Sequence, residues 1–99
     1  MDRWPAVLAA LVQMRSLKDD WDGEGTLAPE STVIDAAMDY AKLSESSLAP
    51  VPDRVHVGVN GTIYFEWDWL TEYCEVEVVS STQIEIRYVD KTKVEASHV

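Results

Sequence analysis

The chain has 99 residues, 46% of them hydrophobic, which is enough for one folded domain with a single core. Its 18 acidic residues outnumber 8 basic ones and give a formal net charge of −10, so direct binding to nucleic acid or to an anionic membrane is disfavoured. The charge instead permits a partner protein with a basic surface, or it serves solubility alone.

The first predicted element is a helix over about residues 3–17. Apolar side chains recur at helical spacing from Trp4 to Met14, and Pro5 fits the first turn. Alanines fill much of the opposite face, so this helix is either buried on more than one side or able to self-associate. The apolar stretch is too short to cross a bilayer and has no cleavage site, so we expect no export signal.

The segment from Asp19 to Gly25 surrounds one tryptophan with four carboxylates and two glycines. In a structural interpretation, Gly23 and Gly25 adopt positive φ and the aspartates satisfy nearby backbone N–H groups. Trp21 then fills the gap where the chain reverses, and we expect it to be buried between the two helices.

The same segment partly matches a calcium-binding loop. Asp20, Asp22 and Glu24 fall at positions 1, 3 and 5 of a helix-loop-helix calcium site. Position 12, which should supply a bidentate glutamate, is Ser31, and Pro29 interrupts the loop. The sequence therefore predicts no metal and no cofactor.

A second helix is predicted over about residues 29–43. Pro29 and Glu30 suit a helix start, and apolar residues from Ile34 to Ala41 form one stripe. The serines and prolines that follow predict a linker over about residues 44–53.

From Arg54 onward the apolar period changes from about 3.6 to 2. Four strands are predicted, at about residues 54–58, 62–68, 72–79 and 83–89, followed by a tail over 90–99. Short connections make the sheet an antiparallel meander. The fold class is therefore α+β, with two N-terminal helices packed on one face of a four-stranded antiparallel sheet in a single domain, residues 1–99.

The turn at Asn60-Gly61 fixes the register of the first hairpin. A two-residue turn would put Val57 opposite Tyr64 and mix apolar and charged residues on one face. A three-residue loop with a glycine bulge pairs Val57 with Ile63 instead, and we prefer it.

This register divides the strand residues between two faces. The inner face, which we expect the helices to cover, holds Val55, Val57, Ile63, Phe65, Trp67, Cys74, Val76, Val78, Ile84, Ile86 and Tyr88. The outer face has two rows across the strands, namely Arg54, Glu66, Glu75, Arg87 and His56, Tyr64, Glu77, Glu85. Cys74, the single cysteine, reads as a buried thiol in a reducing cytoplasm rather than as a nucleophile.

The order of these signals resembles a widespread group of small bacterial and phage-borne proteins without an assigned activity. The matching residues are Trp21, Asp22, Gly23 and Gly25, then Pro52, Arg54, Val55, Asn60, Gly61, Ile63, Glu66 and Trp67. The resemblance spans about residues 17–89. It implies an α+β fold and a mobile-element context, and it supplies no catalytic residue.

The sequence favours binding over catalysis, because it has no phosphate-binding glycine loop, no nucleophile with a base and no metal-ligand spacing. We expect a cytoplasmic, non-enzymatic protein whose acidic face docks on a basic surface, for example an inhibitor of a nucleic-acid-handling protein such as an anti-CRISPR or an antitoxin-like partner. The alternative is a small accessory subunit that assembles through its first helix. The candidate partner-binding residues are Glu66, Glu75, Glu77, Glu85, Tyr64, Asp20, Asp22 and Glu24, and the structural ones are Trp21, Gly23 and Gly25.

Overall fold

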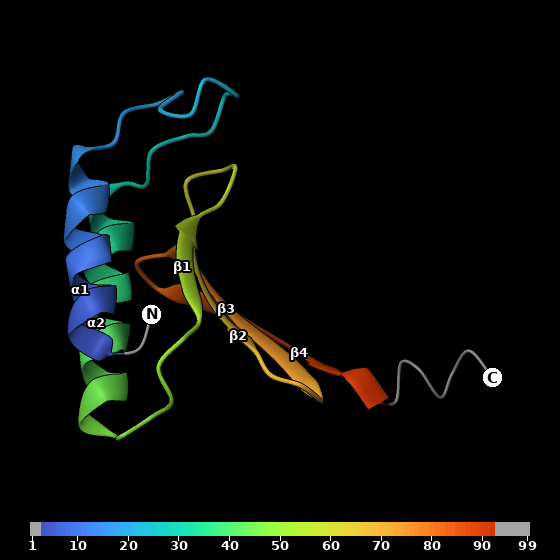
Figure 1. Cartoon of the computed structure of the whole chain (residues 1–99). Helices are drawn as coiled ribbons and strands as arrows, with labels where there is room; N and C mark the ends of the chain where they lie inside the picture. The colour runs from blue at the N-terminus through green and yellow to red at the C-terminus, as the bar shows by residue number, and fades with distance from the viewer. Residues whose placement is uncertain (1–2, 93–99) are drawn as a thin grey trace.

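The computed structural model describes residues 3–92 and has the predicted α+β architecture. The elements in chain order are α1 (Trp4–Gln13), the 3-10 helix η1 (Met14–Ser16), α2 (Ser31–Ser46), β1 (Arg54–Val57), β2 (Ile63–Asp68), β3 (Glu72–Ser80) and β4 (Gln83–Asp90). The strands form one antiparallel sheet in the order β1-β2-β3-β4. Figure 1 shows α1 and α2 side by side against the sheet, with the loop between them projecting beyond the helix ends.

The second helix is shifted toward the C-terminus relative to the prediction, since it runs over Ser31–Ser46 rather than 29–43. In its last turn the hydroxyls of Ser44 and Ser46 donate to the carbonyls of Tyr40 and Lys42, four residues earlier, so these serines lie within the helix rather than in the linker. The linker is correspondingly shorter than predicted. At the other end, β4 reaches Asp90, and residues 93–99 of the predicted tail lie outside the described residues.

Two buried tryptophans hold this linker against the rest of the fold. The indole Nε1 of Trp4 donates to the carbonyl of Ala49 at 3.0 Å, and that of Trp67 donates to Pro50 at 3.0 Å. Pro52, in the same linker, is fully buried. The linker is thus tied to both α1 and the sheet.

The predicted register of the sheet is confirmed. Val57 pairs with Ile63, Trp67 with Cys74 and Val76 with Ile86. Both outer-face rows therefore form as predicted. The bulged turn places Gly61 at φ +77°, and a Cβ there would meet the carbonyl oxygen of Ala28 at 2.9 Å.

The core lies between the helices and strands β2 and β3. Its members are Trp4, Val7, Leu11, Met14, Val33, Ile34, Ala37, Ala41, Ile63, Phe65, Trp67, Val76 and Val78. The prediction that the helices also cover β4 is wrong: Ile84, Ile86 and Tyr88 are 42%, 66% and 57% exposed. The reason is that α2 packs on β2 and β3, while β4, at the edge of the sheet, extends away from the helices (Figure 1).

Within residues 3–92, no helix combines the length and the apolar character needed to cross a membrane.

Candidate functional site

The loop between the helices is held together by its own aspartates. The Asp19 carboxylate accepts the N–H of Ala28 at 3.0 Å, and that of Asp20 accepts the N–H of Gly25 at 2.8 Å. Gly23 and Gly25 have φ of +74° and +82°. The structural interpretation of the aspartates and glycines is therefore confirmed.

Asp22 makes the densest set of these bonds. It accepts the backbone N–H groups of Glu24 at 3.0 Å and Thr26 at 3.3 Å, and the Thr26 hydroxyl at 2.5 Å. The hydroxyl bond, followed by the bond from Glu24, holds the pKa of Asp22 below its usual value. This carboxylate is therefore ionised at neutral pH.

The predicted burial of Trp21 is wrong, because its side chain is 44% exposed. The loop projects past the helices and is closed by polar contacts, namely the aspartate bonds and the N–H of Leu27 donating to the carbonyl of Val59 at 3.0 Å. These polar contacts close the loop while the indole of Trp21 stays partly in solvent. The tryptophans that do fill the core are Trp4 and Trp67.

On the outer face of the sheet, Glu66 is buried beneath two basic side chains. Its Oε2 accepts Nε and Nη2 of Arg54 at 3.0 and 2.6 Å, and its Oε1 lies 2.6 Å from Nε2 of His56. Burial raises the pKa of Glu66, but the bonds from His56 and Arg54 outweigh it and bring the pKa below its usual value. The His56 ring also stacks on Tyr64, with 5.1 Å between centroids and 8° between planes.

The other three glutamates share one guanidinium. Arg87 donates Nε to Glu75, Nη2 to Glu77 at 2.5 Å and Nη1 to Glu85 at 3.2 Å. Glu77 also accepts the Thr62 hydroxyl at 2.7 Å. Burial raises the pKa of Glu77, yet the bonds from Arg87 and Thr62 bring it below the usual value. The glutamates of this face are thus already paired within the chain.

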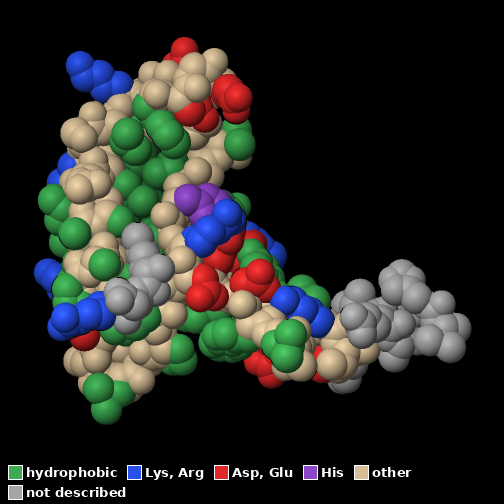
Figure 2. All heavy atoms as spheres, viewed as in Figure 1, with side chains coloured by type: hydrophobic (Ala, Val, Ile, Leu, Met, Phe, Trp, Pro, Cys, Tyr) green, Lys and Arg blue, Asp and Glu red, His purple; other side chains and the backbone are tan. Residues whose placement is uncertain are grey.

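These two regions meet around one surface hollow of about 590 Å³. Five carboxylates line it: Asp22, Glu24, Glu66, Glu75 and Glu77. His56 and Tyr64 also line it, and no Lys or Arg is found among its described lining residues. Figure 2 shows acidic side chains on the projecting loop and again on the sheet, where histidine and Lys or Arg side chains lie beside them.

Most of the predicted partner-binding residues are therefore brought together. Asp20 and Glu85 are the exceptions, because neither lines the hollow. The sequence reasoning did not select His56 or Thr62, although both do line it. His56 could have been selected from the sequence, because the predicted outer row already places it beside Tyr64.

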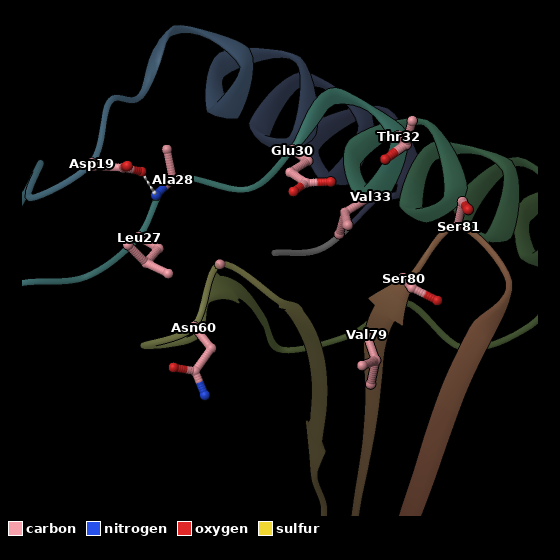
Figure 3. A pocket seen from close by; sticks show the side chains of 11 residues that line it. Asp19, Leu27, Ala28, Glu30, Thr32, Val33, Asn60, Val79, Ser80 and Ser81 are labelled. Atoms are coloured by element: carbon pink, nitrogen blue, oxygen red, sulfur yellow. Dashed lines mark hydrogen bonds between the residues drawn. The ribbon is translucent and has the colours of Figure 1, made fainter.

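A second hollow, of about 400 Å³, lies where the loop meets the β1–β2 turn and the end of β3. Figure 3 shows Asp19 bonded to the N–H of Ala28 on one side, with Glu30 and Asn60 nearby. Because Asp19 is used to close the loop, we assign this hollow a structural role.

Within residues 3–92, the geometry supports neither a metal-binding cluster nor an activated thiol. Among residues 3–92, no group of three or more His, Cys, Asp or Glu side chains is placed to hold a metal ion. Cys74, which was predicted to be buried, is only partly buried. This partial burial, followed by the negative charges of Glu75 and Glu72, raises the pKa of its thiol. A raised pKa disfavours the reactive thiolate at neutral pH.

Comparison of the chain with protein-family models, with curated proteins and with solved structures finds no match. The resemblance to small bacterial and phage-borne proteins therefore stays a prediction, and the function is argued from the hollow itself.

Proposed function

We propose that this chain is a non-enzymatic protein-binding module that receives basic side chains of a partner protein in its acidic hollow. The observation that supports this function is the meeting of five carboxylates from two distant segments, 22–24 and 66–77, around one concave surface. A cation placed there would face carboxylates from more than one side. Complementary charge of this kind accelerates association and selects the partner.

The charges around the hollow are only partly balanced by the chain. Arg54 pairs with Glu66, and Arg87 is shared among Glu75, Glu77 and Glu85. No Lys or Arg among residues 3–92 forms an ion pair with Asp22 or Glu24. The hollow therefore keeps excess negative charge, and most of it lies on the loop side.

The aromatic side chains that line the hollow suit a guanidinium better than an ammonium. His56 and Tyr64 stack with nearly parallel rings, and Arg87 already lies over the Tyr64 ring at 5.9 Å. A planar guanidinium combines stacking on an aromatic face with bidentate bonding to a carboxylate. We therefore expect arginine-rich surfaces to bind best.

Nucleic-acid-handling proteins present such surfaces, because they bind phosphates with Arg and Lys. An inhibitor of the anti-CRISPR or antitoxin type would act by occupying those residues in the cytoplasm. Nucleic acid should then compete with this chain for the partner, while showing no affinity for the chain itself.

The experiment is a calorimetric titration with an arginine-rich peptide at low and high salt. The variant Glu24→Gln with Glu75→Gln removes two charges from the hollow, and Asp39→Asn with Glu45→Gln removes two from exposed positions on α2. Both double variants have the same net charge. We expect the first to weaken binding and the second to leave it near the wild-type value at each salt concentration.

Equal weakening by the two double variants would show that the peptide senses only overall charge, and the hollow would then have no specific role. Binding of duplex DNA by the wild type would contradict the proposal from the other direction.

A further inference from the structure

The edge strand β4 is exposed along nearly its whole length. It has eight residues, Gln83–Asp90, and all of those from 83 to 89 are exposed. One of its edges pairs with β3, and no strand within residues 3–92 pairs with the other. A long edge strand with apolar side chains is a template for pairing with another chain.

The sequence of β4 is complementary to itself when it is read in the opposite direction. An antiparallel pair of β4 strands related by a two-fold axis at Ile86 sets Glu85 opposite Arg87 of the second copy, twice. On the inner face, Ile86 meets its own copy, and Ile84 meets Tyr88. Opposite charges and apolar groups therefore match over residues 84 to 88, and Gln83 faces Val89 at each end of the pair.

Other registers lose this match. Moving the second strand by two residues places Glu85 opposite Glu85, or Arg87 opposite Arg87, at the two-fold axis, and like charges directly opposite are destabilising. Moving it by one residue puts the apolar side chains of one copy beside the charged side chains of the other. Charge complementarity thus favours the register centred on Ile86 over these neighbouring registers.

We propose that the protein forms a symmetric homodimer in which two β4 strands pair antiparallel about Ile86, making one continuous eight-stranded sheet. Both helix pairs then lie on the same side of this sheet, because the two-fold axis runs perpendicular to it. The exposed Ile84, Ile86 and Tyr88 of each copy form one apolar strip between the helix pairs. This surface is separate from the acidic hollow, which Glu85 does not line.

Sedimentation equilibrium over a wide concentration range tests the dimer. Glu85 is 47% exposed and its contact with Arg87 is 3.2 Å, so Glu85→Arg should leave the fold intact. It replaces both Glu85–Arg87 contacts between copies with like-charge contacts, and we expect the dimer dissociation constant to rise about tenfold or more. The matched control is Glu45→Arg on the exposed side of α2, which makes the same charge change and should leave dimerisation unaltered.

Cysteine cross-linking tests the register. In a Cys74→Ala background, Ile86→Cys places two thiols opposite each other at the axis, within the Cα separation of about 4.4–6.8 Å that a disulfide requires. Ile84→Cys leaves the two thiols about 13 Å apart along the strands, beyond disulfide reach. We expect mild oxidation to link Ile86→Cys into a covalent dimer and to leave Ile84→Cys monomeric on a denaturing gel.

A protein that stays monomeric at every concentration overturns the proposal. So does an equal effect of Glu85→Arg and Glu45→Arg, or cross-linking of Ile84→Cys as efficient as that of Ile86→Cys. None of these results bears on peptide binding in the hollow, so the two proposals fail separately.

Discussion

Trp4 and Trp21 provide a direct test of how the fold is held together. Trp4 is 6% exposed and donates its indole N–H to Ala49, whereas Trp21 is 44% exposed on the projecting loop. Truncation of a buried aromatic residue to alanine costs about 3–5 kcal/mol. Loss of the bond to Ala49 is part of this cost, because it frees a carbonyl in the linker.

We therefore expect Trp4→Ala to lower the free energy of unfolding by about 3–5 kcal/mol, a large share of the roughly 5–15 kcal/mol of a domain this size. The melting temperature should fall by more than about 10 °C. Trp21→Ala should cost about 1 kcal/mol or less, as is usual for a surface substitution.

Urea unfolding followed by far-ultraviolet circular dichroism measures both, since removing an indole would alter a fluorescence signal. Trp69→Ala is the matched control, because Trp69 is 41% exposed on another loop. The reasoning would be refuted if Trp21→Ala cost as much as Trp4→Ala while Trp69→Ala cost little. If the slope of the unfolding free energy against urea concentration is the same in all variants, they all unfold from the same compact state.

Three further outcomes follow from the described contacts. Folding lowers the pKa of Glu66, so its ion pairs stabilise the protein above the usual carboxyl pKa of 4.5 and are lost as the pH falls through the folded-state pKa. The difference in urea midpoint between the wild type and Glu66→Gln should therefore be largest at neutral pH and should disappear in acid. Gly25→Ala should lower the free energy of unfolding by about 1–2 kcal/mol because of its positive φ alone. Gly61→Ala should lower it more, because the added Cβ would also meet the Ala28 carbonyl at 2.9 Å. Equal losses in thermal unfolding would contradict the close approach of the turn to the loop. Ca²⁺ should give no heat of binding in calorimetry, because the Asp20 and Asp22 carboxylates already accept backbone N–H groups. Micromolar Ca²⁺ binding that is lost in Asp20→Ala would show that the segment is a calcium-binding loop instead.

The sheet was predictable because its period and turn chemistry act locally. Strand alternation and the bulge at Gly61 determine which residues pair, and the pairs from Val57 with Ile63 to Val76 with Ile86 follow from them. Which strands the helices cover was not predictable from the sequence. It depends on where two helices sit across four strands, and β4 carries the same apolar alternation as β3 although its residues 83 to 89 are exposed.

The candidate site was predictable in its members and not in its shape. The outer row of glutamates follows from strand alternation, and the aspartates follow from the turn-forming residues around Gly23 and Gly25. Their meeting around one hollow depends on the loop reaching the β1–β2 turn, where the N–H of Leu27 donates to Val59. The predicted burial of Trp21 was wrong because residue type alone does not distinguish a tryptophan that fills the core from one that is exposed.

The edge position of β4 also determines where the native state opens. β2 lies between two strands and beneath the helices, so its amides should exchange with solvent deuterium only when the whole domain unfolds. The amides of β4 that bond to β3 lie on a strand whose residues 83 to 89 are exposed, and they should exchange through fraying of that strand from β3 alone. Those on its opposite edge should exchange almost freely in a dilute sample. If two copies pair there, protection of these edge amides should rise with protein concentration while that of β2 stays constant.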